Sequence, residues 1–384
     1  MMDNEHNEFM QSGGDNVVQT QGAAIVNYTN NFYVKHEYPN ALTKDEVTQV
    51  VKEMLCDMET NLICKFREEY KNNAYKLNGI LIPKMEKGDV LGAFGDPGFL
   101  SVLFQAYRTA FLIQEKDAFE VLSELLLNRA AHPKIDNKKI AIEKAVSIIN
   151  NVSDASLKGL AAYYCLLSII PVRGDVYKSL EVYANMFDQL GIEGLPVGRD
   201  WLDELDILGA IRTYDMGMVM KSFDDFMAGI FPGFLVRGIE QGGDSFCDVS
   251  RLLREADIPE NILIPHEFHP HYMRLPVVGD YFDTLEQVVI PNANGSFRTL
   301  DLDSSKRKVL RQVYKNISGN DGISKDDFDK MKKQLTDAID QYEPLRKIKA
   351  WWSQVNTAFS INEVGLAIGY SYAKNKVAEL PERM

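Results

Sequence analysis

Three of the six histidines lie in one short segment, His266-Glu267-Phe268-His269-Pro270-His271, which makes it the first place to look for chemistry. Imidazole nitrogens and carboxylate oxygens are the usual protein ligands of zinc. The helical His-Glu-x-x-His order is absent, and Pro265 and Pro270 prevent a helix here. Any metal site in this segment must therefore be built by a loop.

Such a loop can bring His266, His269 and His271 around one metal ion, with Glu267 or Asp280 as the oxygen ligand. This arrangement predicts a metal-dependent hydrolase or nuclease. The alternative is a structural loop whose histidines hydrogen-bond to backbone or water, and matches this loose are mostly of that kind.

Residues 316–327 resemble a calcium-binding loop between two helices. The glycine of the sharp turn falls one place late, at Gly322, and Asn316 as the first ligand carries no charge. Ser324 as the cap of the next helix, with Asp327 in its first turn, explains the same residues without calcium.

The remaining motifs favour structural roles. Gly92, Gly95 and Gly98 lead into a helix, but their spacing matches no phosphate-binding loop, and Asp96 would oppose a phosphate. We expect a turn and a helix start there instead. Trp351-Trp352 can stack on a base or a peptide, although one core tryptophan and one half-exposed tryptophan is the simpler expectation. No catalytic signature is found, and no cofactor is expected.

Composition describes an ordinary globular protein, with 384 residues, 45% apolar and 25% charged. A net charge of −13 argues against a nucleic-acid partner, because such binding rests on clustered Lys and Arg. The four cysteines have no metal or redox spacing, so we expect Cys56, Cys64 and Cys165 to be reduced core residues. No signal peptide and no membrane-length apolar run is present, which predicts a cytoplasmic protein without a membrane partner.

Apolar residues recur at spacings of three and four along most of the chain, which predicts a mainly α-helical, multi-helix body. We expect the helix at 99–113 to be the most buried, because it is apolar on nearly all sides. Residues 76–98, rich in glycine, are expected to be irregular. The predicted helices span 43–66, 99–113, 118–129, 138–149, 156–170, 176–190, 200–214, 216–226, 304–317, 324–341 and 345–356.

From about Gly229 the pattern changes to short β-prone runs separated by glycine and proline. We predict a small β-containing segment here, with a hairpin turn at Asn294-Gly295 and strands at 262–264, 277–278 and 287–290. The expected organisation is an arm at 1–40, a helical domain at 41–228, the β-containing segment at 229–302 and a C-terminal helical region at 303–384.

A final helix is signalled by Ser360 and Glu363, which have the spacing of a capping box. Gly365 and Gly369 follow one turn apart, and each costs up to about 1 kcal/mol relative to alanine in a helix. Close backbone packing against another element is a good reason to carry that cost. We therefore expect this helix to be docked.

The N-terminal arm interleaves Gly, Asn and Gln with β-branched residues over 13–31. It is too polar for a core strand and too β-prone for a plain linker. Strands of this kind usually find hydrogen-bond partners on another copy, although such a segment can also stay disordered in the free protein. The residues expected to mediate oligomerisation are Asn16, Val17, Val18, Gln19, Gln21, Ile25, Val26, Asn27 and Tyr28.

Four segments together resemble a family of uncharacterised bacterial proteins known by locus labels: 96–106, 118–129, 141–146 and 359–369. Members of that family carry a similar arm, a helical body and a closing helix of the pattern LTxxGxxIA. Ile361 and Asn362 stand here where the family has Leu and Thr. The resemblance supplies no active-site residues, and similar arms occur on proteins suspected of antiviral defence.

These observations predict a homo-oligomeric, non-enzymatic scaffold or sensor, with a role in bacterial antiviral defence by analogy. The metal-dependent hydrolase or nuclease is one alternative. A helical protein- or peptide-binding module is another, and it predicts an exposed apolar groove among the helices at 99–190.

Overall fold

The computed structural model describes residues 17–20, 23–26, 68–113, 116–132, 137–171, 174–214, 220–291, 297–318, 323–355 and 357–382. Contacts divide the chain into two units, Met1–Asn72 and Asn73–Met384. In the first unit, β1 (Val17–Thr20) pairs antiparallel with β2 (Ala23–Val26), and residues 68–72 are helical. The helix predicted at 43–66 lies outside the described residues.

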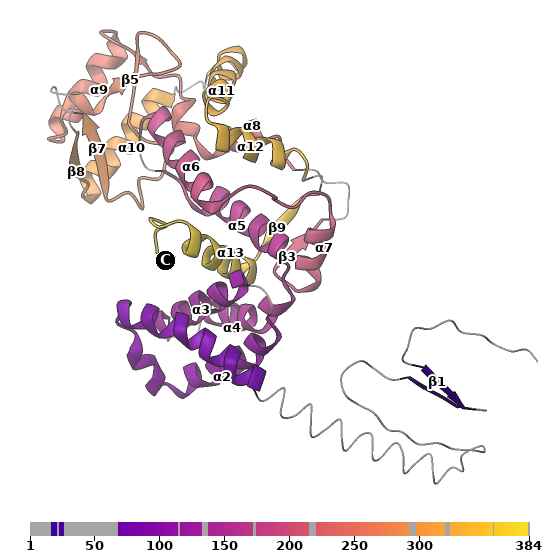
Figure 1. Ribbon diagram of the computed structural model, residues 1–384. Helices are drawn as coiled ribbons and strands as arrows, with labels where there is room; N and C mark the ends of the chain where they lie inside the picture. The colour runs from indigo at the N-terminus through magenta and orange to yellow at the C-terminus, as the bar shows by residue number, and fades with distance from the viewer. Residues whose placement is uncertain are drawn as a thin grey trace, which may run out of the picture. The chain divides into compact units, whose positions relative to one another are not determined.

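The second unit is mainly α-helical, which confirms the predicted fold class (Figure 1). None of its described helices is long and apolar enough to cross a membrane. Its first helix covers residues 73–87. The others are α2 (Pro97–Leu112), α3 (Lys116–Ala131), α4 (Asn137–Ile148), α5 (Asp154–Ser168), α6 (Val176–Leu190), α7 (Asp200–Ile207), α8 (Phe223–Ile230), α9 (Asp244–Glu255), α10 (Ser304–Ser318), α11 (Lys325–Ile339), α12 (Glu343–Trp352) and α13 (Glu363–Lys376), with short 3-10 turns η1 (Leu91–Gly95), η2 (Ile149–Asn151), η3 (Pro232–Phe234) and η4 (Glu260–Ile262).

The described strands of this unit are short and antiparallel. β3 (Ile211–Thr213) pairs with β9 (Phe359–Ile361). The predicted β-containing segment is confirmed, because it holds a three-stranded sheet and a hairpin. Residues 277–278 form no strand, and the strand predicted at 262–264 begins only at Ile264, after η4. The predicted turn at Asn294-Gly295 lies outside the described residues. The sheet has the order β4 (Ile239–Glu240), β6 (Tyr272–Arg274), β5 (Ile264–Pro265), and the hairpin consists of β7 (Gln287–Pro291) and β8 (Phe297–Asp301).

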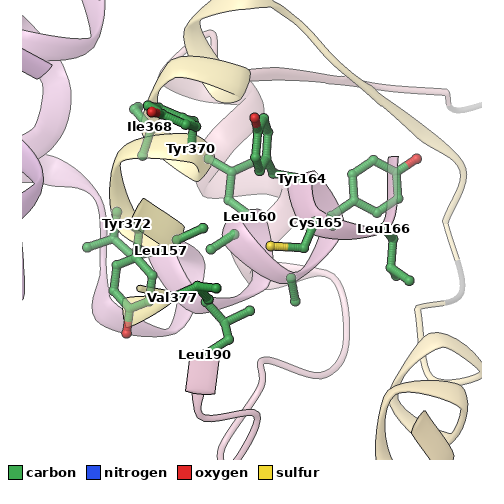
Figure 2. Packing of buried hydrophobic residues seen from close by; sticks show 14 of the residues in the cluster. Leu157, Leu160, Tyr164, Cys165, Leu166, Leu190, Ile368, Tyr370, Tyr372 and Val377 are labelled. Carbon is green, nitrogen blue, oxygen red and sulfur yellow. The ribbon is translucent and has the colours of Figure 1, made fainter. Parts of the chain in front are cut away.

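The larger core forms where α13 packs against α5 on one side and against α3 and α4 on the other. Figure 2 shows Leu160 and Tyr164 of α5 beside Ile368 and Tyr370 of α13. The rings of Tyr164 and Tyr370 meet edge to face, with centroids 5.8 Å apart. The docked closing helix that the sequence predicts is therefore confirmed.

The two glycines of α13 allow this close approach. A Cβ on Gly365 would lie 2.2 Å from the Ala210 carbonyl oxygen, and one on Gly369 would lie 2.9 Å from the Leu160 carbonyl oxygen. Real side chains do not reach such distances, so only glycine fits. The helix propensity lost at these positions is offset by backbone packing.

A second, smaller core lies in the β-containing part of the unit. α9, α10 and β7 all contribute to it, with buried side chains that include Leu253, Leu310 and Ile290, and Phe282 completes this part of the core. This core is separate from the larger one, to which the C-terminal helices α11, α12 and α13 contribute.

The prediction that residues 76–98 are irregular was wrong, because they are helical as far as residue 87. Leu77, Leu81 and Met85 lie one turn apart and are fully buried. Burial of such side chains stabilises by about 1.5–3 kcal/mol each. Together they outweigh the unfavourable helix propensity of the glycine and proline between them, about 1 and 3 kcal/mol.

The most buried helix is α5 and not α2, contrary to the prediction for 99–113. On α2, Phe104 and Leu112 are 63% and 57% exposed. On α5, small residues let neighbours approach, and a Cβ on Gly159 would lie 2.7 Å from Pro196. The burial of a helix here depends on how many other helices pack around it. The apolar content of the helix itself does not determine that number.

The β3–β9 pair replaces two predicted features. The helix predicted at 200–214 ends at Ile207, because the residues of β3 pair with β9 instead. Ser360 is the central residue of β9 and does not cap α13. The cap is Asn362, whose side chain accepts hydrogen bonds from two amides of the first turn.

The helix predicted at 216–226 begins only at Phe223, and residues 215–219 are outside the described part.

Candidate functional site

The arm residues fall partly within the described hairpin. Opposite positions in its register are Val17 with Val26 and Val18 with Ile25, while Gln19 pairs with Ala24. The other residues expected in oligomerisation lie outside the described part of the chain: Asn16, Gln21, Asn27 and Tyr28. The predicted β character of the arm thus takes the form of two short strands that pair with each other.

The histidine segment forms the loop between β5 and β6. His266 is buried, with 5% of its surface exposed. Its Nδ1 accepts a hydrogen bond from the Phe268 amide at 3.1 Å, so the ring proton must be on Nε2, which donates to the Val236 carbonyl oxygen at 2.8 Å. Burial is the main cause that lowers the pKa of His266 to about 4. The ring is therefore neutral at pH 7, and both nitrogens are engaged.

His269 and His271 differ from His266 in their surroundings. His269 hydrogen-bonds through Nδ1 to the Arg237 carbonyl oxygen at 2.8 Å, and its ring stacks on Tyr272 with centroids 3.7 Å apart. His271 is exposed and has a left-handed backbone, with φ of 70°. The rings of His266 and His269 are 6.1 Å apart. These contacts match the structural-loop alternative.

The two carboxylates considered as oxygen ligands are engaged elsewhere. Glu267 binds the guanidinium of Arg274, and Asp280 forms an ion pair with Arg311 at 3.2 Å. Across the described ranges of the chain, no three His, Cys, Asp or Glu side chains are grouped so that they could hold a metal ion.

The Glu267–Arg274 pair is the main polar feature that sequence reasoning missed. Arg274 is fully buried, and its Nη2 also donates to the Gly174 carbonyl oxygen at 2.6 Å. Glu267 accepts a further hydrogen bond from the Val176 amide at the start of α6, at 3.2 Å. The pair therefore ties the histidine loop to the N-terminus of α6. The one local sign of this buried pair in the sequence is that Arg274 stands in an apolar run, next to Leu275.

Two other motifs have the structural roles that the sequence favours. Ser324 caps α11 by accepting a hydrogen bond from the Asp327 amide at 3.1 Å, and it donates to the carboxylate of the same residue at 2.7 Å. Asp96 caps α2 by accepting from the Gly98 amide at 2.9 Å. Residues 319–322 of the calcium-like loop lie outside the described part.

Both tryptophans of the pair are buried, so the prediction that one of them is half-exposed was wrong. Trp351 donates through its indole nitrogen to the Pro196 carbonyl oxygen, and Trp352 donates to the Lys221 carbonyl oxygen, each at 2.8 Å. Because both indoles are satisfied inside the protein, neither is free to stack on a base.

A depression of about 620 Å³ lies between α2 and η2. The exposed Phe104 and Leu112 line it, together with Arg108, which stands between them on the same face of α2. Ser147 and Asn150 supply polar groups on the opposite side. The binding-module alternative predicts an exposed apolar groove among the helices at 99–190. This depression lies among those helices, but Phe104 and Leu112 are the large apolar members of a mostly polar lining.

Comparison with known proteins places the chain in a family. The model of a family whose members are uncharacterised and known by a locus label matches residues 41–381. Comparisons with curated proteins and with solved structures gave no match. The matched region contains the whole helical body and leaves out the arm at 1–40. Since the family model covers well over half of the sequence, the chain belongs to this family of uncharacterised proteins.

Proposed function

We propose that the protein is a non-enzymatic scaffold or sensor that associates with copies of itself through the N-terminal arm. The observation that carries the proposal is the β1–β2 hairpin, whose two strands have four residues each. An isolated two-stranded hairpin is at best marginally stable in water. Among the described residues the sheet consists of these two strands. The outer edge of such a strand presents backbone groups with which a strand from another copy can pair.

The chemistry of the body supports a binding role over catalysis. His266 is neutral and buried with both ring nitrogens hydrogen-bonded, and the carboxylate of Glu267 is held by Arg274. General acid–base catalysis needs a titrating group within reach of a substrate. In the histidine loop these groups are instead held by hydrogen bonds within the protein, His266 by the backbone and Glu267 by the side chain of Arg274.

Deletion of residues 1–40 tests the arm. We expect the truncated protein to have a lower solution mass by multi-angle light scattering, with an unchanged far-UV circular dichroism signal per helical residue. The variant Ile25→Pro removes one amide of β2 and should also lower the mass, whereas Ile25→Val keeps the strand and serves as the matched control. An unchanged oligomeric state in the truncated form contradicts the proposal.

The defence role is proposed from the analogy of the arm and is tested separately. Bacteria that express the protein should form fewer phage plaques than bacteria with an empty vector, and those that express the truncated form should not. Equal plaque counts in all three strains would exclude this role while leaving self-association open.

The second candidate function is a protein- or peptide-binding module, which the groove on α2 favours. Single exposed apolar residues are common, but Phe104 and Leu112 lie two turns apart on one side of a groove. Substitution of both by aspartate should abolish the capture of a specific protein from a lysate of the native host. Aspartate at the exposed Val182 of α6 is the control and should leave capture unchanged.

A further inference from the structure

A cavity of about 380 Å³ opens where the N-terminus of α6 meets the β-containing part of the unit. Its walls are mostly apolar and come from β5, β7 and β8 and from the segment after β6: Ile264, Pro265, Pro276, Val289 and Phe297. Gly174, Asp175, Lys178 and Glu267 complete the lining. At the volume of about 30 Å³ that a water occupies in the liquid, the cavity has room for roughly a dozen non-hydrogen atoms.

The two acidic groups of the lining already have hydrogen-bond partners within the protein. Both oxygens of Glu267 accept hydrogen bonds from Arg274, at 2.7 and 2.6 Å, and one of them also accepts from the Val176 amide. Asp175 caps α6 by accepting from the Lys178 amide at 2.8 Å, where the helix dipole stabilises its charge. Glu267 therefore has its counter-charge in Arg274, and Asp175 is held at the start of α6 by a backbone amide.

The lysine of the lining is in a different position. The Lys178 ammonium lies over the Phe297 ring, 3.8 Å from the centroid. Among the described residues, no carboxylate lies within ion-pair distance of this ammonium. Lys178 is exposed and Phe297 is 53% exposed, so the pair stands at the rim of the cavity. The aromatic ring holds the ammonium next to an apolar cavity. A ligand with an anionic group and an apolar body can therefore contact both at once.

We propose that this cavity binds a small amphipathic monoanion, with a compact apolar body between Ile264, Pro276 and Val289 and a carboxylate on Lys178. The apolar body gains affinity by leaving water, and the carboxylate completes the hydrogen bonding of the ammonium at the rim. The site is independent of the arm, so it stands or falls separately from self-association.

Binding of octanoate and of octanamide, measured by ligand-observed NMR titration on the full chain, tests this site. The two probes have the same size and differ in charge. We expect octanoate to bind roughly two- to fivefold more tightly, the factor that an ion pair with an exposed lysine supplies. In Lys178→Met this preference should disappear while octanamide binding remains. Lys330→Met, at an exposed lysine of α11, is the matched control and should retain the preference.

A second variant tests the place of binding. Val289→Trp fills the cavity from β7, and it should weaken both probes at least tenfold in protein with an unchanged melting temperature. Three results each overturn the proposal: absence of octanoate binding to the unaltered chain, a preference for octanoate that persists in Lys178→Met, or affinities that are unchanged in Val289→Trp. Because Lys178 is exposed, its variant decides the question even where Val289→Trp fails to fold.

Discussion

Arg274 and Glu267 form a bidentate ion pair, with Nε 2.7 Å from Oε2 and Nη2 2.6 Å from Oε1. The remaining guanidinium donor, Nη1, binds the Leu275 carbonyl oxygen at 2.8 Å. Every side of the arginine therefore has a partner, and the pair holds β6, the histidine loop and the start of α6 in one arrangement. Buried charges are tolerated only with this degree of satisfaction.

Glu267→Ala should destabilise the protein by about 3–5 kcal/mol, because it leaves the Arg274 guanidinium buried without its counter-charge. Urea unfolding followed by circular dichroism measures this free energy. Asp248→Ala breaks an exposed ion pair with Arg251, whose side chains are 63% and 67% exposed, and should cost no more than about 1 kcal/mol. Similar losses in the two variants would contradict the structural role of the buried pair.

The stability of the protein should depend on pH through His266. Its pKa is about 4 in the folded protein, against an ordinary value of 6.5, so the unfolded chain takes up the proton first as the pH falls. The contribution of neutral His266 to the free energy of unfolding is complete above pH 6.5. It is lost as the pH falls towards 4, which lowers the free energy of unfolding by about 3 kcal/mol. Protonation also replaces the lone pair on Nδ1 that accepts from Phe268.

His266→Gln, measured by urea unfolding at a series of pH values, should flatten the difference in unfolding free energy between pH 7 and pH 4.5 relative to the unaltered protein. His269→Gln removes a histidine from the same loop and should leave the slope in place. If His266→Gln keeps the full slope, the acid sensitivity arises elsewhere.

Two glycine-to-alanine substitutions should have opposite signs. Gly365→Ala forces a Cβ to 2.2 Å from the Ala210 carbonyl oxygen and should destabilise by about 1–3 kcal/mol or more. Gly79→Ala adds a Cβ that meets no atom within 4 Å in a helix, and should stabilise by about 0.5–1 kcal/mol. Thermal unfolding of both variants under the same conditions checks the pair, and a stabilising Gly365→Ala would show that α13 can move away from β3.

The two described cysteines should differ in reactivity. Cys165 is fully buried, and burial raises its pKa to about 12, whereas Cys247 is exposed. Iodoacetamide at pH 8 should modify Cys247 in the native protein and reach Cys165 only after unfolding in urea, because the thiolate is the reactive form. Peptide mass spectrometry distinguishes the two sites. Equal rates in native protein would mean that α5 is open to solvent.

Local signals were enough for many elements of the fold. α6 has the bounds predicted for it, and the structure shows why: Asp175 caps its first turn, and Gly191 ends it with φ of 73°. The turn at Asp96 and the cap at Ser324 were predicted for the same reason. In each of these places the residues that determine the structure lie within one helical turn of it.

Features that depend on distant partners could not be predicted. Arg274 and Glu267 become a site only when β6 lies beside the start of α6, where Gly174 is a hundred positions away in the sequence. β3 could not be told from a continuing helix without β9, and the exposure of Phe104 could not be told from the apolar pattern of α2. The cavity beside Lys178 likewise has walls from segments that no local pattern connects.

The packing of α13 against α3, α4 and α5 also has a consequence for synthesis on the ribosome. Translation adds only about 5–20 residues per second, so the early helices emerge long before the helix that covers them. During that interval Leu157, Leu160 and Tyr164, which are buried in the finished protein, lack their cover. A nascent chain of this protein is therefore expected to need a chaperone until α13 has been made.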